Sequence, residues 1–283
     1  NQGIELEVGY KLSVDKVNLS FLANASYVKN EIKNLGNQTG YIDKESLPTL
    51  GTVSRNQNGY PIGYFFGYKA IGVFQTQEEI DNYISPATGK PIQPNAVPGD
   101  TKFEDLNGDG VISDDNEDRT MIGKPNPDWI VGLTVAADWN GFDLSAFFQG
   151  SFGADVFDAL RRYELAAVNY TSDALERWTG PGTSNSMPRI VLGDTPKNFR
   201  PSTLLVHDAS FLRLRNLQVG YTLPAQLTRK AYIQRLRFYA SFDNLLTITG
   251  YKGMDPEIGS TMGIDKGVYP QARVYTFGLN LTF

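Results

Sequence analysis

The sequence contains no cysteine and a single histidine, His207. Without cysteine, neither a disulfide framework nor a thiolate metal site can form. The one histidine stands near no nucleophile in a recognised catalytic setting, so a hydrolase triad is excluded. The chain also lacks any run of basic residues, and its formal net charge is -5, which argues against a nucleic-acid partner. We therefore expect neither an enzyme nor a nucleic-acid-binding protein.

Long hydrophobic runs are missing as well. No stretch approaches the roughly 18–20 consecutive apolar residues that a membrane helix requires, so a helical membrane protein is excluded. A transmembrane β-barrel is still allowed, because only every second residue of its strands faces lipid. The composition, with 15 Tyr, 16 Phe and 28 Gly, suits strands, turns and aromatic girdles better than helices.

Apolar and polar residues alternate in seven segments, and this period of two predicts β-strands. The segments are 4–12, 17–28, 129–139, 142–150, 211–223, 236–243 and 272–283. The pattern is least regular in 211–223, where Arg213 and Arg215 share a face with Leu217, Val219 and Tyr221. We expect these two arginines to lie outside the membrane.

An antiparallel sandwich would also show this alternation. The segment 129–139 favours a membrane, because Trp129 and Trp139 stand on one face at its two ends. At about 3.3 Å per residue and a tilt of about 40°, they lie roughly 25 Å apart along the membrane normal, the height of a barrel's apolar band. We predict an interfacial girdle of aromatic side chains: Trp129, Trp139, Tyr275 and Phe283.

The connections alternate strictly between short and long. Short ones fall at 14–16, 140–141 and 224–234, and long ones at about 31–128, 152–210 and 248–270. Outer-membrane barrels place tight turns on the periplasmic side and long loops outside. If Phe283 ends the last strand in the periplasm, all three long connections are extracellular. Because such barrels have an even number of strands, seven imply further strands upstream. Within the second loop, 156–168 has a helical pattern.

Several motifs then carry a family resemblance. The first group is Gly67-Tyr68-Lys69, Gly72 to Ile80, Pro98 to Ile112 and Ile122-Gly123-Lys124-Pro125-Asn126-Pro127. The second group is Phe148-Gln149-Gly150, Phe211 to Leu217, Val219 to Pro224 and Asp243-Asn244-Leu245-Leu246-Thr247. In this order, and together with the terminal Phe283, they closely resemble the C-terminal region of SusC/RagA-type TonB-dependent transporters over nearly the whole chain.

The resemblance implies an all-β fold, with about seven antiparallel strands of a 22-stranded, plugged barrel in the outer membrane of a Gram-negative bacterium. It implies active import of oligosaccharides, or of oligopeptides, beneath a SusD-like surface lipoprotein. The plug and the TonB-contacting segment are N-terminal in the family, and nothing here corresponds to them. The expected partners are the remainder of the barrel and plug, the SusD-like lipoprotein, TonB, lipid and lipopolysaccharide. The alternatives are a passive porin-like barrel and a secreted β-rich binding module stabilised by calcium.

One loop has the spacing of a calcium site. Oxygen donors recur at Asp105, Asn107 and Asp109, Gly110 follows, and the carbonyl of Val111 and the hydroxyl of Ser113 complete the set. The usual acidic residue at the twelfth position is replaced by Asn116. The alternative is an Asx-rich turn without metal. No organic cofactor is expected.

Aromatic side chains in the long loops are candidates for substrate binding, because their rings could stack on sugars or cover peptide side chains. The candidates are Tyr64, Phe66, Tyr68, Tyr163 and Trp178. The alternative for these rings is packing of the loops onto the rest of the protein.

Overall fold

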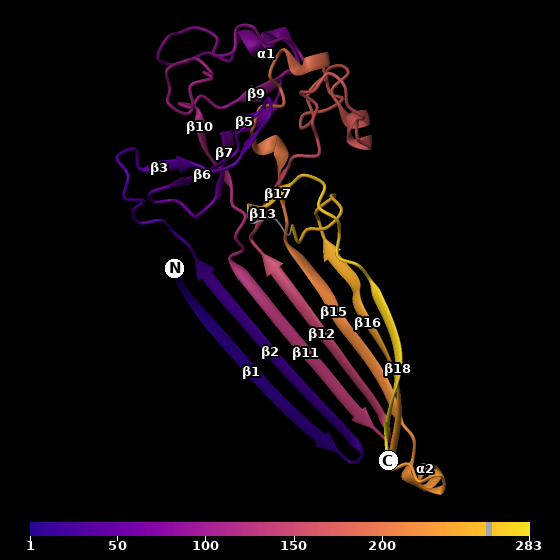
Figure 1. Cartoon of the computed structure of the whole chain (residues 1–283). Helices are drawn as coiled ribbons and strands as arrows, with labels where there is room; N and C mark the ends of the chain where they lie inside the picture. The colour runs from indigo at the N-terminus through magenta and orange to yellow at the C-terminus, as the bar shows by residue number, and fades with distance from the viewer. Residues whose placement is uncertain (259–261) are drawn as a thin grey trace.

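The computed structural model describes residues 1–258 and 262–283. Seven long strands form one curved antiparallel sheet, and the long connections gather in a layer of loops at one end of it (Figure 1). In order across the sheet, the strands are β1 (Gln2–Val14), β2 (Val17–Lys29), β11 (Trp129–Trp139), β12 (Phe142–Phe152), β15 (Phe211–Thr222), β16 (Arg235–Thr249) and β18 (Val274–Thr282). They confirm the seven strands that the alternation predicts.

The strands are joined in sequence order. Tight turns link β1 to β2 and β11 to β12, and the turn between β15 and β16 carries the short helices α2 (Ala225–Thr228) and η4 (Arg229–Ala231). These turns lie together at the end of the sheet where the chain ends, opposite the loop layer (Figure 1). The order of the strands is thus an up-and-down meander, in which all long connections leave from the same end.

The two faces of the sheet differ in chemistry. One face, here called the outer face, is apolar and open: Leu6, Val8, Phe277 and Leu279 on the edge strands are more than half exposed. The register continues this face to Trp129 and Trp139, whose partners are Tyr27 and Phe152 at one end and Val17 and Phe142 at the other. A continuous exposed apolar surface of this kind is typical of strands that face lipid.

The opposite, inner face is mostly polar or small, with Asn24, Ser145 and Gln149 among its side chains. Near the turn end, Arg237 on β16 donates to Asp143 on β12 through Nε at 2.8 Å and Nη2 at 2.5 Å, and it also donates to Gln218 on β15 at 3.0 Å. This bidentate pair joins three strands on the inner face. No helix in the described part of the chain is long and apolar enough to span a membrane.

The first long connection builds short strands and one helix. These are β3 (Tyr41–Asp43), β4 (Ser46–Leu47), β5 (Gly51–Thr52), β6 (Ser54–Gln57), β7 (Tyr64–Tyr68), β8 (Ala70–Val73), α1 (Gln77–Asp81), β9 (Thr101–Phe103) and β10 (Arg119–Gly123). They form a sheet in the order β10-β7-β6-β3 and two small hairpins, β4-β5 and β8-β9.

The second and third connections share a further sheet. The second contains β13 (Asp155–Asp158), η1 (Ser172–Glu176), η2 (Leu192–Asp194), η3 (Thr203–Leu205) and β14 (Val206–Asp208), and the third contains β17 (Ile264–Asp265). The order β14-β13-β17 joins the two connections. The core of the loop layer packs Phe65, Phe157, Leu205 and Ile264 together, so all three connections contribute to it.

Two predictions about local structure are wrong. The helix expected over 156–168 is absent: the segment starts within β13 and continues without helix or strand from 159 to 168. Val156 and Phe157 pair instead with His207 and Val206 of β14. The sheet pairing, made with residues far away in the sequence, replaces the local helical preference.

Arg213 does not share a face with Leu217. A β-bulge leaves Arg215 unpaired between Leu214 and Asn216, and opposite it Asn244 and Leu245 of β16 are also unpaired. Asn244 takes a left-handed conformation there, with φ of 52°. The extra residue reverses the alternation, so Arg213 pairs with Gln149 on the inner face, whereas Leu217 is on the outer face.

Candidate functional site

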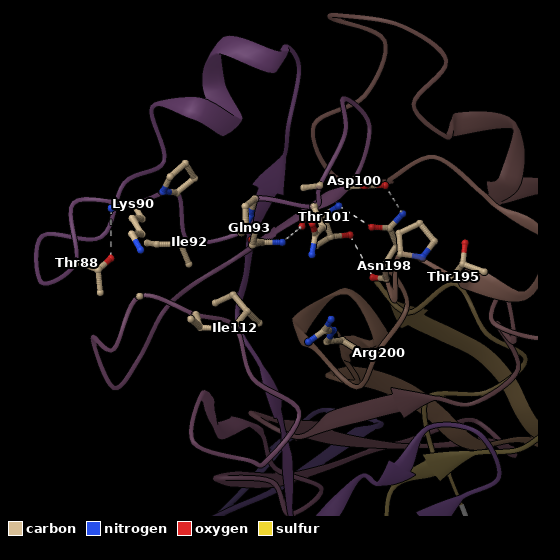
Figure 2. A pocket seen from close by; sticks show the side chains of 17 residues that line it. Thr88, Lys90, Ile92, Gln93, Asp100, Thr101, Ile112, Thr195, Asn198 and Arg200 are labelled. Atoms are coloured by element: carbon tan, nitrogen blue, oxygen red, sulfur yellow. Dashed lines mark hydrogen bonds between the residues drawn. The ribbon is translucent and has the colours of Figure 1, made fainter.

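A large cavity of the loop layer lies between the first and second connections. This loop pocket has a volume of about 710 Å³. Figure 2 shows Lys90, Ile92 and Ile112 on one side of it and Thr195, Asn198 and Arg200 on the other. A cavity of this size, with mixed apolar and polar walls, can take a small molecule or one segment of an oligomer.

The floor of the loop pocket is a buried polar network. Asn198 Oδ1 accepts the backbone N–H of Thr101 at 2.8 Å, and Asn198 Nδ2 donates to Asp100 Oδ1 at 3.0 Å (Figure 2). Arg189 Nε donates to the same Asp100 oxygen at 2.6 Å. Buried polar groups that are all paired make a rigid unit, so this network fixes the first connection to the second.

Asp194 fixes the backbone at Asn198, the residue at the centre of this polar network. Its two carboxylate oxygens accept the backbone N–H groups of Asn198 and Phe199 at 2.9 and 2.8 Å. Burial raises the pKa of Asp194 to about 6, although both hydrogen bonds act to lower it. The carboxyl therefore titrates near neutral pH while it supports the pocket.

Arg200, in one wall of the loop pocket, is also part of a stack in which arginines and aromatic rings alternate. Arg200 lies 4.8 Å from the ring centre of Tyr68 and 4.9 Å from that of Phe103. Further members continue the stack, which in order is Tyr41, Arg55, Phe66, Arg119, Tyr68, Arg200 and Phe103. Cation–π contacts of this kind stabilise packed loops. We call it the arginine–aromatic stack.

The structure does not bring the five aromatic candidates for substrate binding to one surface. Phe66 and Tyr68 are buried in the arginine–aromatic stack, and Tyr64 is buried against Tyr60 with its hydroxyl bonded to Gln57. Burial raises the pKa of Tyr64 to about 12.

Tyr163 is buried in a different cluster, with its ring centre 4.8 Å from that of Phe199. Trp178 keeps part of its surface, and its Nε1 donates to Gln75 Oε1 at 3.1 Å. Burial favours packing for the other four, and a role in binding stays a prediction for all five.

The predicted calcium loop is ordered by its own hydrogen bonds. Asp105 accepts the N–H groups of Gly108 and Gly110 through its two oxygens, at 2.8 and 2.9 Å, and Asp109 Oδ1 accepts that of Val111 at 2.8 Å. Asn107 Nδ2 donates to Asp109 and to Glu117, at 3.0 and 2.9 Å.

The loop is closed by Asp118, which is fully buried and accepts the N–H groups of Leu106 and Ser113. The hydroxyl of Ser113 donates to Asp115. Within residues 1–258 and 262–283, no three His, Asp or Glu side chains are grouped as metal ligands. Metal binding stays a prediction, and the oxygen donors that it requires are present in the loop.

The predicted girdle residues all reach the surface. Trp129, Trp139, Tyr275 and Phe283 are each about half exposed or more. Trp129 packs on Tyr27 and Trp139 on Phe142, with ring centres 5.0 and 6.2 Å apart. Trp129 and Trp139 lie at the two ends of β11, as an interfacial girdle requires, and the girdle role stays a prediction for all four residues.

Sequence reasoning missed the residues that form the floor of the loop pocket. Asp100 lies in a motif that carries the family resemblance, but nothing around Asn198 or Asp194 marks them as partners. Asp100 and Asn198 are 98 positions apart. Only the fold brings them together.

The curated proteins that are similar in sequence to this chain are TonB-dependent receptors. No family model matches the chain. It is 34% identical to a TonB-dependent receptor of Formosa agariphila over 238 residues, which cover 80% of this chain and 23% of the relative. It is 30% identical over its whole length to the TonB-dependent receptor SusC of Bacteroides thetaiotaomicron, of which it covers 26%.

Two solved structures are similar to the whole fold. The RagAB peptide transporter matches with a TM-score of 0.74 and 26% identity, over 99% of this chain and 29% of that chain. The RagAB peptide importer in its open-open state matches with a TM-score of 0.72 and 27% identity, over 99% and 28%. The chain thus spans less than a third of the length of these relatives.

Proposed function

Since the chain belongs to the TonB-dependent receptors of the SusC/RagA type, we propose that it is part of an active outer-membrane importer of oligosaccharides or oligopeptides. The observation that carries the proposal is the sheet with two different faces. Its outer face is apolar and exposed, its inner face is polar, and every long connection leaves from one end. A soluble sandwich would bury its apolar face, whereas a barrel that encloses a water-filled path presents that face to lipid.

The orientation and the partners belong to the same proposal. We place the long connections outside the cell and Phe283 in the periplasm. The partners are the rest of the barrel and plug, a SusD-like surface lipoprotein, and TonB, which would act through the N-terminal region of the full receptor. The resemblance of the motifs and the names of the relatives support this assignment.

The loop pocket is the proposed contact with cargo on the outer side. Lys90 is exposed at its edge, Arg200 lies in its wall, and Ile92 and Ile112 supply apolar surface. Among the aromatic candidates, Trp178 keeps surface for a ligand. Tyr64, Phe66, Tyr68 and Tyr163 would act indirectly, by fixing the shape of the loops.

Uptake by whole cells tests the function. The full-length receptor is expressed in a strain that lacks it, and cells are given fluorescently labelled oligosaccharides or oligopeptides of graded length. We expect uptake of one class, loss of uptake without TonB, and co-purification of a surface lipoprotein. Uptake that persists without TonB would favour a passive porin. Recovery of the protein without detergent would favour a secreted binding module.

We also propose that the loop from Asp105 to Ser113 binds Ca²⁺ through Asp105, Asn107, Asp109, the carbonyl of Val111 and Ser113, and that the ion would rigidify the loop. The support is the oxygen-only donor set, which suits a hard cation. Calorimetric titration of CaCl₂ into chelator-treated receptor should give heat and a higher melting temperature. Asp109→Asn should weaken both effects, while Asp81→Asn, on helix α1, is the control. Absence of heat and of a shift in the wild type would leave an Asx-rich turn.

A further inference from the structure

The segment Gly253–Ile258, here called the strap, folds back from the end of β16 onto the inner face. Asp255 accepts Arg213 Nη2 at 2.6 Å, and Glu257 accepts Arg213 Nη1 at 3.0 Å. Glu257 also accepts Arg215 Nη2 through both carboxylate oxygens, at 2.7 and 2.6 Å. Two arginines and two carboxylates thus form a compact cluster.

The β-bulges make this cluster possible. Without the extra residue in β15, Arg213 would lie on the outer face with Leu217, where no carboxylate is available. With it, Arg213 is only 2% exposed, and its Nε donates to Thr247 on β16 at 2.9 Å. Arg215 is held on its other side by Gln149 of β12 at 2.6 Å. Both guanidinium groups are therefore held by the sheet as well as by the strap.

The strap is fixed to the cluster through its backbone as well. Asp255 accepts the N–H groups of Glu257 and Gln271, both at 2.9 Å. Burial acts to raise the pKa of Asp255, but these bonds and Arg213 outweigh it and hold the pKa below its usual value. Ile258 adds an apolar contact with the cluster of Ala154, Val156, Ala209 and Tyr251.

The strap covers part of the inner face. A cavity of about 230 Å³ is lined by Ile130, Gln149 and Ser151 from the sheet and by Pro256, Glu257 and Ile258 from the strap. In the register, Ile130 and Ser151 are partners at the loop end of β11 and β12. The strap therefore overhangs the inner face where the long connections begin.

We infer that Arg213 and Arg215 are positioning residues that clamp the strap over the inner face, and that the strap restricts the cargo path on this side. The inference rests on the proposed function, since it requires a transport path along the inner face. The clamp is ionic and its two arginines lie on β15, so the sheet contributes directly to the position of the strap, together with the contacts from Gln271 and around Ile258.

Thiol labelling of purified full-length receptor tests the clamp. Ser151→Cys places a thiol under the strap, and a maleimide carrying polyethylene glycol measures access to it. Residues 1–283 contain no cysteine, and the receptor without Ser151→Cys, labelled in parallel, gives the background from the rest of the protein. Glu257→Gln keeps the size of the side chain and removes its charge. Because charge-assisted bonds are among the stronger hydrogen bonds, labelling should become about tenfold faster or more. Hydrogen exchange at the amides of Glu257 and Gln271 should accelerate in parallel.

Two further variants make the result decisive. Arg215→Lys keeps the charge but loses the guanidinium nitrogens that bond Gln149 and Asn244 while Nη2 contacts Glu257, so it should give an intermediate rate and guards against a folding defect in Glu257→Gln. Asp143→Asn breaks the ion pair at the other end of the sheet and should leave labelling of Ser151→Cys unchanged. Equal labelling or equal exchange in wild type, Glu257→Gln and Arg215→Lys overturns the inference.

Uptake separates the inference from the proposed function. In cells, Glu257→Gln should raise uptake of the longest labelled oligomers relative to the shortest. If the wild type takes up none of them, the proposed function fails, whereas the labelling result still reports the clamp. If wild type and Glu257→Gln show the same dependence on length, the restriction of the path is overturned.

Discussion

Asp194 shows how a single buried side chain can couple the loop pocket to pH. The residue is 6% exposed, and its φ of 42° lies in the left-handed region. It accepts two backbone N–H groups, but burial still raises its pKa to about 6. The charged form therefore costs free energy in the folded loop at neutral pH.

The first prediction concerns pH and Asp194→Asn. The folded pKa of about 6 lies above the 3.8 of a free aspartate side chain, so the folded loop binds more protons between these values. Its stability should rise as pH falls from 7 to 4, by about 2–3 kcal/mol. Asn tolerates the left-handed conformation and cannot titrate, so Asp194→Asn should lack this rise.

Hydrogen exchange at Asn198 and Phe199, corrected for intrinsic rates, measures this effect. Asp114→Asn is a useful control, because Lys197 lowers the pKa of Asp114, and its removal leaves the titration of Asp194 in place. If the two variants have the same pH profile, Asp194 is not the group that titrates.

At the scale of the elements, side chains from β12 and β16 pack closely against a glycine of β15. Gly220 on β15 lies between Asp143 and Arg237, and an added Cβ would come within 2.6 Å of the Asp143 carboxylate and of Arg237 Nε. The backbone is extended at this position, so the need for glycine comes from the lack of space. The bidentate ion pair that joins the three strands depends on that space.

The second prediction is Gly220→Ala. The methyl group should displace Arg237 from Asp143, and the loss should lower the free energy of unfolding by about 1–3 kcal/mol. Thermal unfolding of the full receptor in detergent measures it. Gly250→Ala is the matched control, because an added Cβ there meets no atom within 4 Å. An equal loss in the two variants would show that the ion pair is not the cause.

The sequence predicts the long regular strands, but it does not predict the β-bulge or the short strands of the loop layer. All seven strands follow from alternation, because each strand has one apolar face. The bulge at Arg215 interrupts that alternation, so the arginines are placed on the wrong face. The strands of the loop layer are two to five residues long, too short for a period to show. Their pairing, like the contact between Asp100 and Asn198, depends on residues distant in the sequence.

For the whole molecule, the two faces have opposite relations to solvent. The outer face runs across all seven strands without interruption, and the inner face holds both the Asp143–Arg237 pair and the strap. Adjacent residues of one strand therefore face either the exposed apolar surface or the polar inner side. This property distinguishes a lipid-facing sheet from a sandwich, in which the apolar face is the buried one.

The last prediction compares neighbours in the middle of β11. Val135 lies on the outer face with Phe21 and Ala146 as partners, and Thr134 lies on the inner face with Leu22 and Phe147. An arginine on the lipid face near the bilayer midplane costs about 2–4 kcal/mol, whereas substitutions on the inner side of a barrel cost less. Val135→Arg should therefore reduce folding of the full receptor into lipid vesicles much more than Thr134→Arg. Gel migration before and after heating gives the folded fraction. In a soluble sandwich, Val135→Arg would be equally harmful in detergent-free buffer and in vesicles, and equal losses for the two arginines would contradict a lipid-facing outer surface.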